Sequence, residues 1–539
     1  MLTHIFINYY HKFFLLLMII NAVLIIYYFN DIKRFFCKIK RRTWILLYLI
    51  ILSSLLMKIF FLPHATLIFN DEYGHAAIAL NIKYVDKYGT CQSGPIYDCE
   101  KVSLYNVWPG IAPLIYSLFF SVFGDNLIIA NYVNIILSSI SIGIFFLISY
   151  LLSKRENVSL MATLIFSLTP TLVKLSTTGG LETTSVFFIL LASLFMYLFL
   201  LKQKNSFLML FVANFGIAIS VRVENILLVP LFGFFLIFYY KRLDLKKIST
   251  KILYLAFLIF AISLFFSVGI IISGLTQETG MAGWSLNLQT IFGHLKNHIG
   301  NNMLFLIDPA SNLFFLIPLS IFGSFIMIKK NRTKLFILIS SFLVYFLFNS
   351  SIHIGYFNLA GEGCRFSAVL YIPLVLLTIP SIQKILNSCG KKNGKKMMVV
   401  VLLFIFVVIL AFFNTFSNIK NQSAIQYIQG DIEEMYGAIF ETNVTKIVNP
   451  TAMYFTGNRI QLYDLNKSKY DLWFNNSYRF IRTLNIEELP PEFIFVREIS
   501  YFDFPEEDFA KIKKNYNSSL IKRFDYEEKG ISLELIHFQ

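Results

Sequence analysis

WPGIAPLIYSLFFSVF, residues 108–123, decides the fold of this chain, because the run is apolar enough to cross a membrane. If it crossed, every basic loop that follows it would move to the opposite side of the bilayer. Pro109 and Pro113 interrupt the first helical turns, and a span needs roughly 20 apolar residues. We therefore predict a helix that lies in the outer membrane interface.

Composition places most of the chain in a lipid bilayer. Of 539 residues, 56% are hydrophobic and 15% are charged, whereas a soluble protein of this length needs more polar surface. The net charge of +15 does not indicate a nucleic-acid partner, because the basic residues lie in short loops between apolar runs. From residue 416 onward, 14 Lys and Arg accompany 18 Asp and Glu, so the positive excess belongs to the preceding part.

Apolar runs predict an all-α polytopic membrane domain of about 12 transmembrane helices over residues 1–415, with interfacial helices in the first external loop. The first run lacks a small-residue cleavage site, so we interpret it as a retained helix. The predicted spans lie near residues 13–29, 44–62, 126–152, 158–173, 181–201, 206–220, 225–240, 252–274, 311–328, 334–350, 366–383 and 397–415.

Basic residues gather in alternate loops, namely those that follow the first, third, fifth, seventh, ninth and eleventh of these spans. The positive-inside rule places these loops in the cytoplasm. The other loops and the tail then lie on the external side of the cell membrane. We predict that this tail, 416–539, is a small α/β soluble domain. Its expected strands are KIVNP (446–450), RIQLYDL (459–465), EFIFVRE (492–498) and ISLELIHF (531–538), the last at a sheet edge.

The ionisable groups of the membrane domain lie at the outer ends of the spans, apart from Lys58 within its helix. A coupled transporter usually places such groups at mid-membrane. A cluster at the boundary instead suits chemistry between a lipid headgroup and an external acceptor. The groups are Asp71, Glu72, His75, Lys174, Glu182, Arg222, Glu224, His294, His298, His353, Glu362 and Arg365.

Purely structural explanations exist for several of these groups. Asn70 can cap a helix in which Asp71 and Glu72 favour the positive end of the dipole, and Glu182 is a similar first-turn acid. Arginines such as Arg222 often mark the membrane interface. The position of the acids directly outside a span, ahead of a long loop, favours a functional interpretation.

Arg365 and the pair His294 and His298 are candidate ligands for phosphate and for a metal ion, respectively. An arginine outside the cytoplasm runs against the positive-inside bias, and its planar fork is well suited to binding phosphate. His294 and His298 are spaced for one helix face, but no third ligand lies nearby in the sequence, so we assign them no metal site.

The order of these features resembles the glycosyltransferase C superfamily, in particular the family 39 branch with protein O-mannosyltransferases and lipid A aminoarabinose transferases. The resemblance covers roughly residues 44–383, and it departs from the family in an additional first helix and in Ala112-Pro113, where a Pro pair is common. The matching motifs are Asp71-Glu72, the segment Pro109–Asp125, Lys154-Arg155, Pro170 followed by Glu182, Arg222 before a Pro-containing span, and Arg365 followed by Pro373.

The resemblance implies a membrane glycosyltransferase that moves a sugar from a polyprenyl (dolichyl or undecaprenyl) phosphate to an external acceptor. A phosphate leaving group needs only positive charge, and the acceptor hydroxyl needs one base, so we expect a single inverting displacement. Asp71 and Glu72 are the expected catalytic residues, with Asp71 as the base. Glu182 and His75 would orient the acceptor or hold a metal ion. The expected phosphate ligands are Arg222, His353 and Arg365.

The motifs define the class of reaction but not its substrates. The sugar, the acceptor (lipid, glycan or protein), the oligomeric state and a requirement for a divalent cation are not determined by these motifs. The alternative function is a multi-pass transporter or lipid flippase, which predicts mid-membrane ionisable residues and two similar halves. We observe neither in the sequence.

Cys91 and Cys99 bracket seven residues, among them Gly94 and Pro95, in the first external loop. An oxidising compartment permits disulfides, so we expect a Cys91–Cys99 bond that braces the loop carrying the acids.

The predicted topology can be tested in intact cells. A cysteine introduced between Lys241 and Lys251 should resist a membrane-impermeant thiol reagent, because this basic loop is predicted to be cytoplasmic. Labelling at this position would reverse the orientation and the predicted side of the site.

Overall fold

The structure is a computed structural model, and it confirms a largely helical membrane protein. Among the described residues, seven helices are long and apolar enough to cross a membrane, so the count of twelve spans stays a prediction. The described residues are 2–62, 71–93, 101–103, 110–239, 248–275, 288–352, 357, 364–388, 394–420, 438, 446–448, 479–481, 491–499, 506–526 and 531–539.

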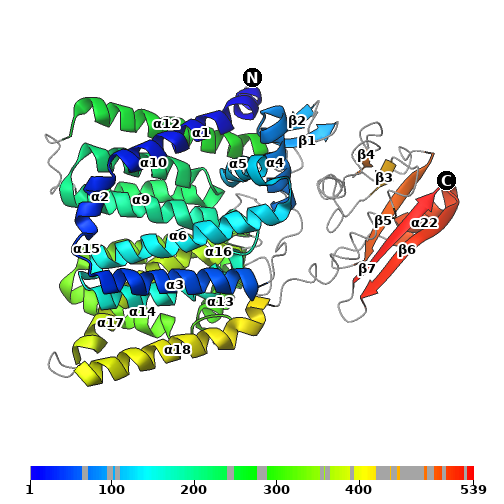
Figure 1. Ribbon diagram of the computed structural model, residues 1–539. Helices are drawn as coiled ribbons and strands as arrows, with labels where there is room; N and C mark the ends of the chain where they lie inside the picture. Colours follow the sequence, from blue (N-terminus) through cyan, green and yellow to red (C-terminus); the bar gives the residue numbers. More distant parts are fainter. Residues whose placement is uncertain are drawn as a thin grey trace.

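The helices pack side by side as a bundle (Figure 1). The predicted span near 158–173 divides into α7 and α8 at Pro170, and α18 continues past residue 415 to Lys420. The 3-10 segments are η2 (Val223–Leu227) and η5 (Ala368–Leu370). The α-helices are α1 (Leu2–Tyr27), α2 (Phe29–Phe36), α3 (Arg41–Phe60), α4 (Asp71–Val85), α5 (Ala112–Phe123), α6 (Leu127–Ser153), α7 (Glu156–Ser167), α8 (Pro170–Leu175), α9 (Glu182–Lys202), α10 (Asn205–Ile219), α11 (Leu228–Tyr239), α12 (Thr250–Leu275), α13 (Leu288–Ile307), α14 (Leu316–Lys330), α15 (Arg332–Ser350), α16 (Cys364–Ser367), α17 (Tyr371–Ser388) and α18 (Gly394–Lys420).

Helix α5, the described helical part of the run that decides the topology, is short. It contains 12 residues, which corresponds to about 18 Å, well short of a hydrocarbon core of about 30 Å. Pro113 lies in its first turn, where the missing N–H is tolerated, and the helix packs against α4 and α6. This length agrees with the predicted interfacial helix, whose place in the membrane stays a prediction.

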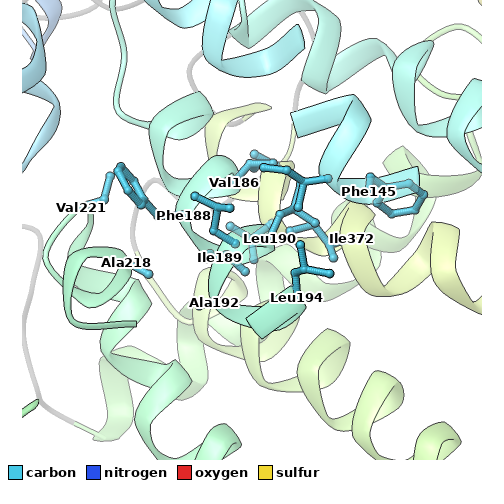
Figure 2. Packing of buried hydrophobic residues seen from close by; sticks show 14 of the residues in the cluster. Phe145, Val186, Phe188, Ile189, Leu190, Ala192, Leu194, Ala218, Val221 and Ile372 are labelled. Atoms are coloured by element: carbon cyan, nitrogen blue, oxygen red, sulfur yellow. The ribbon is translucent and has the colours of Figure 1, made fainter. Parts of the chain in front are cut away.

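Helix α9 is the centre of the bundle. It is apolar on all sides, and 72% of its apolar window is buried, the highest share among the seven candidate spans of the described chain. Figure 2 shows Phe188, Ile189 and Leu190 of α9 between Phe145 of α6 and Val221, which follows α10. Because α9 begins with Glu182, this packing fixes where that carboxylate lies.

The basic loops meet at one end of the bundle. Lys204 forms an ion pair with Asp31 at 3.0 Å, and Glu156 accepts hydrogen bonds from the Lys40 amide at 3.1 Å and the Thr43 hydroxyl at 2.6 Å. Figure 1 places α2 at this end and α4 and α5 at the other. Three of the predicted basic loops therefore lie at the same end, whereas the alternation of the other loops and the external side stay predictions.

Helix α1, the additional first helix, connects separate parts of the opposite end. Tyr10 of α1 lies against Tyr88 with ring centroids 4.3 Å apart, and its hydroxyl donates to the Ser220 carbonyl at 3.0 Å. Tyr88 in turn exchanges hydrogen bonds with the backbone of Gly110, at 3.0 and 2.9 Å. These contacts join the segments after α4, before α5 and before η2.

An ion pair reinforces the same connection. His11 and Lys12 contact the carboxylate of Asp86 at 2.8 and 2.6 Å, and Asp86 has a left-handed backbone with φ of 54°. Partial burial raises the pKa of Asp86, but its interactions with Lys12 and His11 lower it, and the net shift is downward. The interaction therefore stabilises the fold above the ordinary carboxyl pKa and is lost as the pH falls through the lowered value.

The tail contains a mixed five-stranded sheet of order β4-β3-β5-β7-β6, with the core formed by Phe493, Phe495 and Phe538 against Phe509 of α22 (Glu506–Asn515). β3 runs parallel to β4 and β5, and β7 is antiparallel to β5 and β6. A separate hairpin precedes α5. The strands are β1 (Thr90–Ser93), β2 (Lys101–Ser103), β3 (Lys446–Val448), β4 (Arg479–Ile481), β5 (Phe493–Ile499), β6 (Ser518–Tyr526) and β7 (Ile531–Phe538).

The predicted position of 531–538 at a sheet edge is wrong, because β7 lies between β5 and β6. β6 has the sequence SSLIKRFDY, in which Lys522 and Arg523 interrupt the apolar alternation that signals a strand. The predicted strand at 459–465 lies outside the described residues.

The close packing of α14 on α17 can be tested at Gly323. A Cβ atom there would overlap the Leu377 carbonyl oxygen, so Gly323→Ala should push the helices apart and destabilise the protein by about 1–3 kcal/mol. Thermal unfolding in detergent measures the loss. Gly300→Ala in α13, where an added Cβ meets nothing within 4 Å, is the control and should be neutral or stabilising.

Candidate functional site

Ionisable side chains from separate helices converge at the end of the bundle that carries α4 and α5. We call the following set the charge cluster: Glu72 of α4, Lys174 of α8, Glu182 of α9, Arg222 and Glu224 at η2, and Arg365 of α16. Glu72 and Lys174 are each only 1% exposed. Glu72 and Glu182 both lie in the first turns of long helices, where the dipole stabilises a carboxylate. This end of the fold therefore holds several charges out of water.

Arg222 lies between two carboxylates. Its Nη1 atom contacts Glu182, and its Nε atom lies 2.5 Å from Glu224 Oε1. All three side chains are 10% exposed or less. Burial strengthens such interactions and also makes an uncompensated charge costly, so the three residues form one interdependent unit.

The η2 segment that carries Arg222 and Glu224 is locked to its neighbours. Asn225 donates to the Ser185 hydroxyl of α9 at 2.8 Å and to the Ala218 carbonyl of α10 at 2.7 Å. The Tyr345 hydroxyl of α15 lies 3.3 Å from the Asn225 side-chain oxygen. Because the apolar bundle cannot solvate these polar groups, the hydrogen bonds hold the turn in one position.

The turn before α9 is held by two side chains. Asn134 of α6 donates to the carbonyls of Thr178 at 2.6 Å and Gly180 at 2.8 Å, and the Tyr116 hydroxyl of α5 donates to Gly180 at 2.9 Å. Burial raises the pKa of Tyr116, and the carboxylates of Glu182 and Glu72 raise it further. Helix α5 thus contacts the turn that leads to Glu182 of the charge cluster.

Gly180 leaves no space beside the Glu182 carboxylate. A Cβ atom at this position would overlap Glu182 Oε2. The small residue therefore allows the turn to approach the carboxylate closely, and any larger residue would displace Glu182 from Arg222.

Arg365 joins the cluster through an aromatic ring. Its guanidinium lies 4.9 Å from the ring centroid of Phe366, and the guanidinium of Arg222 lies 5.6 Å from the same ring. Both distances are within the range of cation–π attraction. The neighbouring Cys364 thiol is buried, and the charges of Lys174, Glu182, Arg365 and Glu72 all act on it, so these four groups lie in its electrostatic surroundings.

The structure brings together only part of the predicted site. Glu72, Glu182, Arg222 and Arg365 belong to the charge cluster, and His75 is buried on the same helix as Glu72. Asp71 is the first residue of that helix. Their predicted roles stay predictions. His353 and Cys99 lie outside the described residues, so neither the third phosphate ligand nor the Cys91–Cys99 bond is tested.

Three residues that the structure places at the site were assigned no functional role from the sequence. Glu224 and Lys174 were recognised as ionisable groups at the outer ends of apolar runs. Their roles could not be predicted, because these depend on interactions that involve other segments of the chain. Tyr116 lies in the run that decides the topology, and the sequence gives no sign of its contact with the turn before α9.

No metal site is evident among the residues that the structure describes, where no group of three or more His, Cys, Asp or Glu side chains is close enough to share an ion. The ring centroids of His294 and His298 are 5.6 Å apart on α13. A divalent cation at Glu182 and His75 stays a prediction.

Comparisons with known proteins support the resemblance to the glycosyltransferase C superfamily. Residues 108–270 match a family described as dolichyl-phosphate-mannose-protein mannosyltransferase. The fold is similar to that of ArnT from Cupriavidus metallidurans bound to undecaprenyl phosphate, with a TM-score of 0.55 and 9% identity over 92% of this chain and 98% of the other. ArnT in the apo state gives a TM-score of 0.55 and 10% identity, over 91% and 97%. No curated protein matches the sequence.

Because the buried ion pairs depend on one another, the effects of their substitutions on protein stability should not be additive. Arg222→Met leaves Glu182 and Glu224 without their shared cation and should destabilise the protein by about 3–5 kcal/mol. Adding Glu182→Gln and Glu224→Gln should restore most of the stability, because the uncompensated charges are removed. Thermal unfolding of the purified proteins measures both effects, and an Arg222→Met protein with wild-type stability would contradict the assignment.

Proposed function

We propose that this chain is a glycosyltransferase that moves a sugar from a polyprenyl phosphate to an acceptor at the charge cluster, on the external face. One observation carries the proposal: Arg222 and Arg365 approach the same ring, Phe366, beside the buried carboxylates Glu182 and Glu72. Cations next to carboxylates at the end of an apolar bundle supply what a phosphate leaving group and a hydroxyl acceptor require.

The comparisons support the class of donor. The matched family is described by a dolichyl-phosphate-linked mannose, and the similar ArnT structure contains undecaprenyl phosphate. Both are isoprenoid phosphates. A bundle whose helices expose large apolar side chains, such as Phe257 and Leu258 of α12, is compatible with an isoprenoid chain lying alongside it.

The proposed chemistry is one displacement. The acceptor hydroxyl attacks the anomeric carbon, the bond from that carbon to the phosphate oxygen breaks, and the proton passes to a carboxylate. Asp71 is the proposed base, and Glu72 and Glu182 orient the acceptor. Arg365, with Arg222, stabilises the phosphate as its negative charge increases. A base on the face opposite the leaving group inverts the anomeric configuration.

The decisive experiment incubates the purified protein with a panel of polyprenyl-phosphate hexoses and pentoses and candidate acceptors. Consumption of one donor, with release of polyprenyl phosphate, is expected. If no donor is consumed but a labelled lipid crosses proteoliposome membranes, the transporter or flippase alternative replaces this proposal.

The role of Asp71 predicts a separation of turnover from binding. Asp71→Asn keeps the helix-capping ability, so the protein should fold and bind donor normally, while turnover falls by about 10²–10⁴-fold. Glu156→Gln, at the opposite end of the bundle, is the control and should retain turnover. If Asp71 served only to start the helix, Asp71→Asn would be nearly silent, and Glu72 would become the candidate base.

A further inference from the structure

Lys58 is a buried ionisable residue that the proposed chemistry does not use. It is 1% exposed and lies in α3, a helix long and apolar enough to span the membrane. Its ammonium donates to the Ser138 hydroxyl of α6 at 2.6 Å. An ionisable residue within a span is expensive to bury, so it indicates a function together with a partner.

A small cavity with both polar and apolar lining residues lies between Lys58 and Glu182 of the charge cluster. Its volume of about 20 Å³ is room for roughly one water molecule. The polar side chains that line it are Lys58, Ser138, Ser141, Ser167, Glu182 and Thr183. Glu182 is the one carboxylate among the lining residues that the structure describes.

The hydroxyls around this cavity are arranged to accept hydrogen bonds. Ser141 donates its hydrogen to the Leu137 carbonyl at 2.8 Å, and Ser167 and Thr183 donate theirs to backbone carbonyls at 2.9 and 3.1 Å. A hydroxyl has one hydrogen, so further contacts of these oxygens are as acceptors. The cavity therefore suits a donor such as an ammonium group or a water molecule.

Glu182 has a cation now, but that cation is one of the proposed phosphate ligands. In the structure, Arg222 contacts Glu182 and Glu224. If Arg222 turns to a donor phosphate, it releases at least one contact with these carboxylates. Glu182, which is 5% exposed, would then be left as a buried charge, and this would weaken donor binding.

We propose that Lys58 is the replacement counter-ion for Glu182: when Arg222 turns to the carrier phosphate, the Lys58 ammonium neutralises Glu182 across the cavity, directly or through one water molecule. The four-carbon stem of lysine allows such a movement, whereas the helices need not move. The inference rests on the proposed function. This role explains why α3 contains a buried lysine, Lys58, beside a cavity that Glu182 also lines.

Lys174 is the competing candidate, because it too lies near Glu182, on the side of Cys364. It does not line the cavity. The two candidates can therefore be distinguished by which lysine is coupled to Glu182. If Lys58 is the replacement cation, its removal should couple to Glu182 only when a phosphate is bound.

The test is a double-mutant cycle on the purified full-length protein, with undecaprenyl phosphate as the probe and its dissociation constant as the readout. Lys58→Met should weaken binding by about 5–150-fold, the usual range of coupling between sites. In a Glu182→Gln background the same change should alter binding by less than about twofold. Without lipid, Lys58→Met should be as stable as the wild type or more so, because a buried charge is removed.

Matched variants make the outcome specific. Lys83→Met also removes a lysine near this end, one paired with Asp125, and should leave binding unchanged. Lys58→Gln, which keeps a polar group beside Ser138, should weaken binding as Lys58→Met does. The inference would be overturned if both Lys58 variants bound the lipid with wild-type affinity, or if Lys58→Met lost as much affinity in the Glu182→Gln background as alone. It would also be overturned if the affinity cycle coupled Glu182 to Lys174 instead of Lys58. No saturable binding by the wild type would contradict the proposed function itself.

Discussion

The ion pair between Arg222 and Glu182 is the interaction on which the rest of the site depends. Both charges lie inside an apolar bundle, where each is tolerated only because the other is present. Helix α9 carries Glu182 and is buried on all sides, so the carboxylate cannot move without the core. The neighbouring η2 segment is tied to the same helix through Asn225 and Ser185. Fold stability and site geometry therefore share one set of contacts.

The surrounding elements serve this ion pair from different directions. α5 and α6 shape the turn before α9 through Tyr116 and Asn134, which is why the short helix α5 matters to the site. α16 supplies Phe366 as a shared apolar surface for two guanidinium groups. Removing any of these supports would leave a buried charge poorly compensated, which is more costly than the lost contact itself.

The sequence was sufficient for the class of fold and for the end of the bundle at which Glu182, Arg222 and Arg365 lie. Hydrophobic runs and the distribution of Lys and Arg are strong signals in a membrane protein, because the bilayer imposes them on every helix. The pairing of Arg222 with two carboxylates was not predictable, since it depends on how α9 and η2 pack. β6 was missed because Lys522 and Arg523 interrupt its apolar pattern.

Helix α1 also imposes an order on biosynthesis. It leaves the ribosome before the other described helices, yet it packs against α10 and α12, which follow some 180 or more residues later. At roughly 5–20 residues per second, α1 waits on the order of 10–40 s for these partners. During that interval Tyr10 has no Ser220 to bind. The brace that joins α4 to η2 therefore forms only after Ser220 has been synthesised, and a nascent chain that stops before α10 inserts lacks it.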